Sequence, residues 1–107
     1  MIIRVEVDAR RRTVRLVGRF DAHETPQFRE TVAPLLTEDA NVLRLDLSQV
    51  AFVDSSALAE LIALQKAAQR LGGEVILEQI SDPVRVILEI TDLSELFTIE
   101  DGATGTR

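Results

Sequence analysis

The sequence has no cysteine and a single histidine, His23. Disulfide bonds and thiol chemistry are therefore excluded, and a metal site built from histidine and cysteine ligands is not expected. An enzyme that uses histidine as a general base would have only this one candidate. The sequence predicts neither a metal nor any other cofactor.

Long apolar runs and positive charge are also scarce. The longest apolar runs are about four residues, whereas a membrane-spanning helix needs about 20, so no membrane span is expected. The N-terminus alternates apolar and polar residues without a secretory signal, which makes a cytoplasmic protein the expectation. Twelve basic residues against 18 acidic ones leave a net charge of -6. Because phosphate binding needs a basic surface, nucleic acid is not an expected partner.

The remaining composition is that of one ordinary domain. The 107 residues are 46% hydrophobic and 28% charged, which is enough for a single core. We expect a domain over residues 1–100 and a flexible C-terminal tail over residues 101–107, DGATGTR. A free sheet edge near the first strands would allow dimers and the net charge would oppose them, so we expect a monomer or a weak dimer.

Alternation of apolar and polar residues predicts two strands near the N-terminus. Ile2 to Val7 and Thr13 to Gly18 both alternate with a period of two residues. Asp8 to Arg12, which includes three arginines, lies between them and predicts a solvated polar turn. The two segments therefore predict a β-hairpin.

The middle of the chain predicts a strand–helix–strand unit. Strands are expected over residues 42–47 and 74–80, and a long helix over residues 56–71 that ends at Gly72 and Gly73. Such a unit gives two parallel strands with a right-handed crossover. Because both strands carry charged residues on their second face, we expect the helices to cover mainly one face of the sheet.

Two further helices and a short strand complete the predicted fold. Thr25-Pro26 begins a helix over about residues 26–37, and Asp82 caps a helix that begins at Pro83. A short edge strand is expected over residues 97–100. The predicted class is α/β, with a mixed four- to five-stranded sheet made from the N-terminal hairpin and the parallel βαβ unit.

Asp54, Ser55 and Ser56 stand at the start of the long helix, after an apolar turn that contains Phe52. Their side-chain oxygens could cap the helix, whose first N–H groups lack internal partners. A phosphoserine would also fit there, facing backbone N–H groups and the positive end of the helix dipole. Its charge would oppose docking on an apolar or acidic partner. Both interpretations stay open from the residues alone.

Asp54, Ser55 and His23 also supply the residue types of a hydrolase triad. No G-x-S-x-G motif surrounds the serine, so the sequence does not predict an enzyme. We expect His23 on the surface of the loop after Phe20, and Phe52 in the core because phenylalanine is usually buried.

Several motifs together resemble one known family. They are Gly18-Arg19-Phe20-Asp21 after the hairpin, the run LDLSQVAFVDSSAL, and GGEVILEQISDPVRVILEITDLSELFTI after the long helix. The combination resembles the STAS-domain family and, more narrowly, the bacterial anti-sigma factor antagonists. The resemblance covers nearly the whole chain and implies a STAS-like fold.

The resemblance also implies a mechanism in which Ser55 accepts a phosphate. The donor would be an anti-sigma factor that is also an ATP-dependent serine kinase. The unphosphorylated chain would bind this kinase and free the sigma factor, the phosphorylated chain would dissociate, and a PP2C-type phosphatase would reset it. Asp54 would position the serine or contact the kinase, and Asp21 would belong to the same docking surface.

The family's Asp-Ser-Ser is usually followed by glycine, whereas this chain has Ala57. The alternative is a constitutive STAS adaptor or scaffold that binds a transporter ATPase or a signalling assembly without phosphoswitching. Such an adaptor would use small residues on the exposed flank of the long helix. The expected partner-binding residues are Asp21, His23, Asp54, Ser55, Ser56, Ala57, Ala63 and Ala67.

Overall fold

A computed structural model describes residues 1–8 and 11–100. The predicted tail and the centre of the first turn lie outside these residues. The elements follow in the order β1 (Ile2–Asp8), β2 (Arg11–Phe20), α1 (Thr25–Val32), a 3-10 turn (Ala33–Leu35), β3 (Val42–Val53), α2 (Ser55–Arg70), β4 (Glu74–Glu78), α3 (Asp82–Ile90), a second 3-10 turn (Ser94–Leu96) and β5 (Thr98–Glu100).

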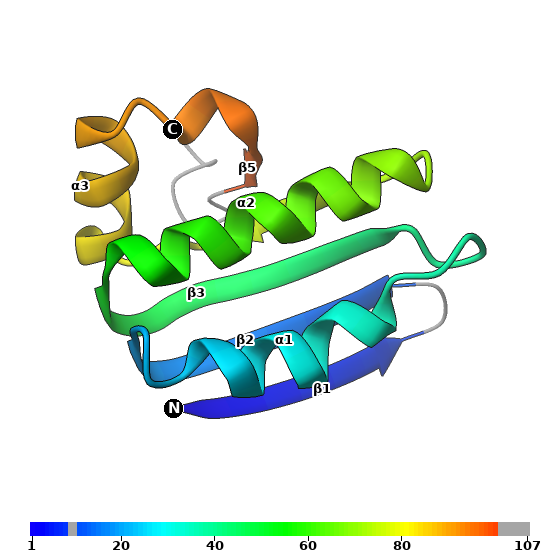
Figure 1. The fold of residues 1–107 in the computed structure, drawn as a ribbon, viewed down its shortest axis with the longest axis horizontal. Coiled ribbons are helices and arrows are strands. Elements are labelled where there is room, and N and C mark those ends of the chain that lie inside the picture. Colours follow the sequence, from blue (N-terminus) through cyan, green and yellow to red (C-terminus); the bar gives the residue numbers. More distant parts are fainter. Residues whose placement is uncertain (9–10, 101–107) are drawn as a thin grey trace.

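The strands form one mixed sheet in the order β1-β2-β3-β4-β5 (Figure 1). β1 and β2 are antiparallel, and the other neighbouring pairs are parallel. The predicted hairpin, parallel βαβ unit and α/β class are therefore confirmed. Helices α1 and α2 lie across the same face of the sheet. This arrangement agrees with the prediction that the helices cover mainly one face.

The core lies between the sheet and this helical layer. The rings of Phe20 on β2 and Phe28 on α1 pack against each other at an angle of 42°, with centroids 4.7 Å apart, and are almost fully buried. Burial of each such side chain contributes about 1.5–3 kcal/mol to the free energy of unfolding. The strands and helices also bury Val14, Leu16, Leu43, Leu45, Leu47, Val75, Leu77, Val32, Leu58, Leu61, Leu64, Val84 and Leu88.

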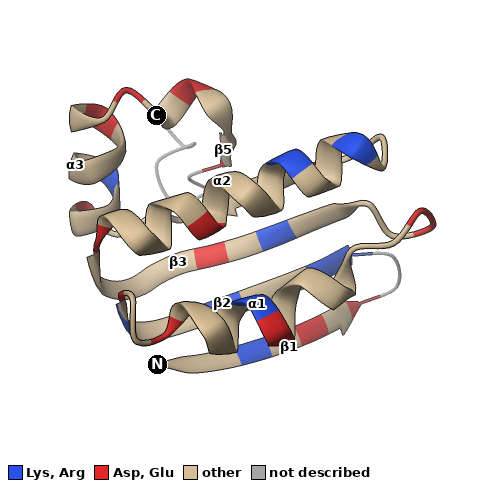
Figure 2. Cartoon of the chain, viewed as in Figure 1, with Lys and Arg blue, Asp and Glu red and all other residues tan. Residues whose placement is uncertain are grey.

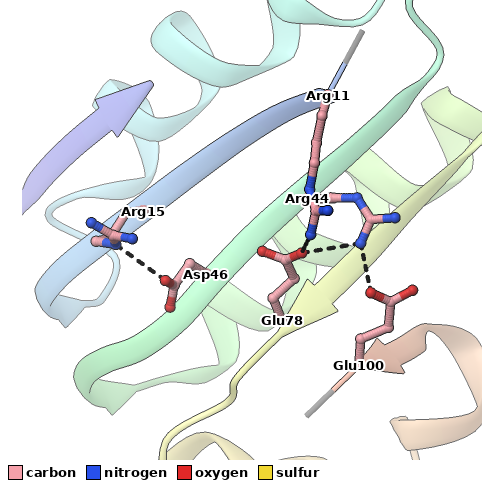
Figure 3. Close-up of polar contacts among 6 residues, drawn as sticks. All are labelled: Arg11, Arg15, Arg44, Asp46, Glu78 and Glu100. Atoms are coloured by element: carbon pink, nitrogen blue, oxygen red, sulfur yellow. Dashed lines mark hydrogen bonds and ion pairs between the residues drawn. The ribbon is translucent and has the colours of Figure 1, made fainter. Parts of the chain in front are cut away.

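The opposite face of the sheet carries ion pairs between strands (Figure 3). Arg44 on β3 donates to Glu78 on β4 at 3.0 Å and to Glu100 on β5 at 2.6 Å. Arg11 on β2 donates to the same Glu78 oxygen at 2.7 Å. Arg11 therefore belongs to a strand rather than to the solvated turn that we predicted. Charged side chains of this kind favour contact with water over burial beneath a helix.

The second half of β3 corrects two predictions. The apolar segment after residue 47 is not a turn but strand, because β3 continues to pair with β2 as far as Phe20 and Val53. Two shifts in register along this pairing break the simple alternation of buried residues. Phe52 is 37% exposed instead of buried, and the Arg19 guanidinium lies 4.1 Å from its ring centroid. This cation–π contact stabilises the ring at the surface.

Two helix ends also differ from the prediction. The predicted first helix ends as a 3-10 turn that contains Pro34, because proline lacks the N–H that would continue the α-helical hydrogen bonds. Ser81, and not Asp82, occupies the N-cap position of α3, and Asp82 is the first helical residue. The Ser81 hydroxyl instead donates to the carbonyl oxygen of Val50 at 2.6 Å, which ties α3 to β3.

The end of α2 needs both of its glycines, for different reasons. Gly72 has a φ of +86°, which favours glycine. Gly73 lies so close to the preceding loop that a Cβ atom would be 1.9 Å from the carbonyl oxygen of Asn41. Within the described residues, no helix is long and apolar enough to cross a membrane.

Candidate functional site

Two chain segments meet where β2 and β3 end. These strands are neighbours and parallel, so their C-terminal ends lie at the same edge of the sheet. Phe20 and Val53 are paired at that edge, and the N–H of Asp54 donates to the carbonyl oxygen of Phe20 at 3.3 Å. The turn before α1 therefore lies beside the start of α2.

The carboxylate of Asp54 fastens these two segments together. Its Oδ1 accepts the N–H of Ala57 at 2.9 Å and so caps α2. Its Oδ2 accepts the N–H of Ala22 in the neighbouring turn, also at 2.9 Å. One side chain thus satisfies a free donor at the helix start and holds the turn in place.

Asp21 shapes the turn from the other side. Its Oδ1 accepts the N–H of His23 at 3.0 Å, and its Oδ2 lies 3.7 Å from Nε of Arg19. Its carbonyl oxygen accepts the N–H groups of Glu24 and Thr25, which begin α1. The structure therefore places Asp21 and Asp54 in neighbouring segments that the Asp54 carboxylate joins.

Ser55 is the first residue of α2 and its side chain is exposed. Within residues 1–8 and 11–100, its hydroxyl has no hydrogen-bond partner. The half-buried Ser56 hydroxyl is likewise without a partner in this part of the chain. Helix capping therefore accounts for the presence of Asp54 at this position, but it does not account for the presence of the two serines.

Ala57 occupies the third position of α2 and is fully buried. Its N–H is taken by Asp54, and its methyl group belongs to the core. This side chain supports the helix start from within and does not form part of the exposed surface. A glycine here would leave that part of the core unfilled.

His23 is exposed in the turn before α1. Among the residues that the structure describes, no hydrogen bond joins its side chain to Ser55 or to Asp54. Both carboxylate oxygens of Asp54 are engaged by backbone N–H groups. The three residues therefore do not form the chain of hydrogen bonds that a Ser-His-Asp triad requires.

Ala63 and Ala67 lie apart from this surface. At 1.5 Å rise per residue, Ala63 is about 12 Å and Ala67 about 18 Å along α2 from Ser55. Both line a groove of about 150 Å³ between α1 and α2. An ion pair between Arg29 and Glu60 lies in its wall. The predicted partner-binding residues thus fall into two separate groups.

A second groove, of about 350 Å³, lies between the end of β3 and α3 and was not predicted. Val86, which lines this groove, is 51% exposed, and Ile90 further along α3 is 73% exposed. These two residues are four positions apart, on the side of α3 away from the buried Val84 and Leu88. Apolar residues on both sides of a short helix were the signal in the sequence. The groove is lined by Ala51, Phe52, Val53, Asp82, Pro83, Val86 and Ile87.

Acidic residues gather where the turn before α1 meets the start of α2 (Figure 2). Asp54 precedes Ser55, and Asp21 and Glu24 lie in the turn fastened to Asp54. The positive charge of Arg19 is shared between Asp21 and the ring of Phe52. The surface around the serine therefore combines negative charge with an apolar groove.

Comparison with known proteins gives a consistent result. The model of the STAS domain family matches residues 3–103. The anti-sigma-B factor antagonist of Listeria monocytogenes is 29% identical over 86 residues, which are 80% of this chain and 75% of that protein. The match therefore spans most of this chain and most of the Listeria protein.

Solved structures share the fold at lower identity. An anti-sigma factor antagonist from Mycobacterium paratuberculosis has a TM-score of 0.82 at 21% identity and covers 92% of this chain and 84% of its own. The Bacillus cell fate determinant SpoIIAA in its phosphorylated form has a TM-score of 0.73 at 19% identity and covers 98% and 96%. With a family match over almost the whole chain and the same five-stranded architecture, this chain belongs to the STAS domain family.

Proposed function

We propose that this chain is an anti-sigma factor antagonist controlled by phosphorylation of Ser55. The unphosphorylated chain binds an anti-sigma factor that is also an ATP-dependent serine kinase, and the sigma factor is released. Phosphorylation of Ser55 ends this binding, and a PP2C-type phosphatase restores it. The chain is then a substrate and a binding partner, and the catalysis belongs to the kinase and the phosphatase.

The observation that carries the proposal is the free hydroxyl of Ser55. A serine that caps a helix has its oxygen engaged by a backbone N–H, but here Asp54 does the capping. The Ser55 side chain is exposed at the surface, and its modification breaks no hydrogen bond to the part of the chain that the structure describes. The Listeria relative is named as an antagonist of this class, and SpoIIAA, which shares the fold, has been solved in a phosphorylated form.

The expected effect of the phosphate is on docking and not on folding. A phosphoserine carries a charge of about -1.5 to -2 at neutral pH. At the first position of α2 the helix dipole favours that charge by about 0.3–1 kcal/mol, and the nearby Asp54 opposes it. The two effects leave the fold in place. A partner that covers the acidic surface around Ser55 and the adjacent groove lined by Phe52 would have to bury the added charge, which weakens binding.

The first experiment is an intact-mass measurement on the protein purified from its native cells, followed by peptide mapping. The proposal expects one phosphate, located on Ser55. With the purified anti-sigma factor kinase, Ser55→Asp should weaken binding at least a hundredfold, and Ser55→Ala should bind as the wild type does. Ser56→Ala is the matched control, because it removes the neighbouring hydroxyl and should still accept the phosphate.

A phosphate on Ser56 instead of Ser55 would contradict the proposal. So would equal binding of Ser55→Asp and Ser55→Ala. Circular dichroism of each variant separates a loss of docking from a loss of fold. The fold should be kept, since the Ser55 hydroxyl forms no hydrogen bond within the described residues.

A constitutive STAS adaptor is the second candidate, and the groove between α1 and α2 favours it. This groove lies away from Ser55 and is lined by the small residues Ala63 and Ala67. A partner held there would be insensitive to phosphorylation. An adaptor predicts that Ala63→Phe or Ala67→Phe abolishes binding while Ser55→Asp leaves it unchanged, which is the reverse of the phosphoswitch.

A further inference from the structure

β1 lies at an edge of the sheet. It pairs with β2 on one side, and among the described residues no strand lies on its other side. Its seven residues are exposed except for the half-buried Ile3. The backbone N–H and C=O groups that point away from β2 are thus available to a further strand.

The helix-facing side of β1 is apolar and open to solvent. Ile3, Val5 and Val7 alternate along this side, because Ile3 and Val5 lie opposite the buried Leu16 and Val14 of β2. Val5 is 41% and Val7 63% exposed. Among the described residues, this edge therefore exposes Val5 and Val7 beside the half-buried Ile3.

The other side of β1 carries charges that are poorly matched within the chain. Arg4 lies directly opposite Arg15 of β2, which is a like-charged pair. Arg15 is engaged by Asp46 at 3.1 Å and by Glu6 at 3.6 Å. Over the described residues, Arg4 itself forms no ion pair. Arg4 and Glu6 are two positions apart on this side of the edge strand.

We propose that a second copy of this chain covers the edge, by antiparallel pairing of the two β1 strands about a two-fold axis at Val5. Residues whose numbers sum to ten then lie opposite each other. Arg4 of each copy faces Glu6 of the other, so the pairing supplies two opposite-charge pairs. On the helix-facing side Ile3 faces Val7 and Val5 faces its own symmetry mate, while Ile2 faces Asp8 at the ends.

The charge pattern selects this register. A two-fold axis perpendicular to the sheet pairs only residues of the same parity, because side chains alternate between faces. An axis at Arg4 would place two arginines opposite each other, and an axis at Glu6 would place two glutamates opposite each other. Like charges directly opposite are destabilising in a sheet. The axis at Val5 avoids both clashes.

Sedimentation equilibrium over a range of concentrations tests the proposal. The wild type should form a reversible dimer. Arg4→Glu should weaken it at least tenfold, because two Arg–Glu pairs become Glu–Glu pairs. Glu6→Arg should weaken it similarly by creating two Arg–Arg pairs. An equimolar mixture of the two variants should dimerise, because each variant supplies the charge that the other lacks, and the double variant should dimerise alone.

Matched controls separate this interface from the effect of net charge. Lys66→Glu changes the net charge from -6 to -8, as Arg4→Glu does, on the exposed side of α2. Glu38→Arg changes it to -4, as Glu6→Arg does, in an exposed loop. Both controls should dimerise like the wild type.

Three results would overturn the proposal. One is a wild type that stays monomeric into the millimolar range. Another is a dimer that Arg4→Glu and Glu6→Arg do not weaken, which would place the contact elsewhere. The third is a mixture of these variants that fails to dimerise although each is folded, which would reject the pairing about Val5.

Discussion

Asp54 and Ala22 are 32 positions apart in the sequence and are joined by a hydrogen bond of 2.9 Å. The same carboxylate caps α2 through Ala57. Asp54→Ala removes both acceptors, and we expect it to lower the free energy of unfolding by about 1–3 kcal/mol. Urea unfolding followed by circular dichroism measures this change.

Asp54→Asn is the matched variant for this prediction. An asparagine has one carbonyl oxygen, so it can accept the N–H of Ala57 or that of Ala22, but its amide group cannot accept the other. Its loss of stability should therefore be smaller than that of Asp54→Ala. Equal stability of Asp54→Ala and the wild type would show that the two hydrogen bonds contribute nothing.

The two glycines after α2 should differ sharply in their tolerance of alanine. At Gly73 a Cβ atom would lie 1.9 Å from a backbone oxygen of Asn41, so Gly73→Ala must displace the loop or the helix end. At Gly72 the nearest atom, Nδ2 of Asn41, would be 3.7 Å away. We therefore expect a modest cost of about 1 kcal/mol for Gly72→Ala, from its positive φ alone. Thermal unfolding should show a much larger loss for Gly73→Ala, and similar losses would contradict this account.

Gln65 is a buried polar residue that links three elements. Its Oε1 accepts the N–H of Val75 on β4 at 2.7 Å, and its Nε2 donates to the carbonyl oxygen of Leu96 at 2.9 Å. Gln65→Leu has nearly the same size but leaves both backbone groups without this partner. Each unsatisfied group costs about 1–3 kcal/mol. Chemical denaturation should show this loss, whereas Gln69→Leu, at an exposed position one turn later, should change stability little.

Asp46 should make stability depend on pH. Burial favours its neutral form, but hydrogen bonds from the Ser48 N–H and hydroxyl and from Arg15 outweigh burial and lower the pKa of Asp46. Because the folded pKa lies below the unfolded value of about 3.9, this stabilisation is present above that value. It is lost as the pH falls through the folded pKa.

Asp46→Asn should therefore be less stable than the wild type at neutral pH, by about 1.5–3 kcal/mol. The difference should shrink as the pH falls below the ordinary range of an aspartate. Unfolding curves from neutral to acidic pH check this, with Asp39→Asn as a control on an exposed loop. A difference that stays constant with pH would contradict the role given to the Asp46 charge.

The order of the helices and strands was predictable because each element has one side facing the core. Apolar residues therefore recur along its sequence with the period of a helix or a strand. The end of β3 was not, because register shifts against β2 break the alternation and place the buried Val50 and Val53 three positions apart. Phe52 was predicted in the core from its residue type. Its contact with Arg19 comes from the neighbouring strand and has no signal in the local sequence.

The candidate site was predictable in part for a similar reason. Asp54 and Ser55 could be chosen from residue types at a helix start. That Asp54 forms the hydrogen bonds while the Ser55 hydroxyl forms none could not be predicted. The hydrogen bond from Ala22 to Asp54 depends on β2 and β3 being neighbours in the sheet. The burial of Gln65 could not be predicted either, since a glutamine in a helix ordinarily faces water.

The parallel pairing of β2 and β3 also determines how the site meets a partner. The two segments of the site follow β2 and β3, which are paired up to their last residues. The Asp54 side chain joins the two segments through its hydrogen bond with Ala22. The proposed recognition surface is therefore already formed within the chain, and little ordering entropy would oppose the binding of a partner. A partner would distinguish two states of such a preorganised surface by its charge and not by its shape.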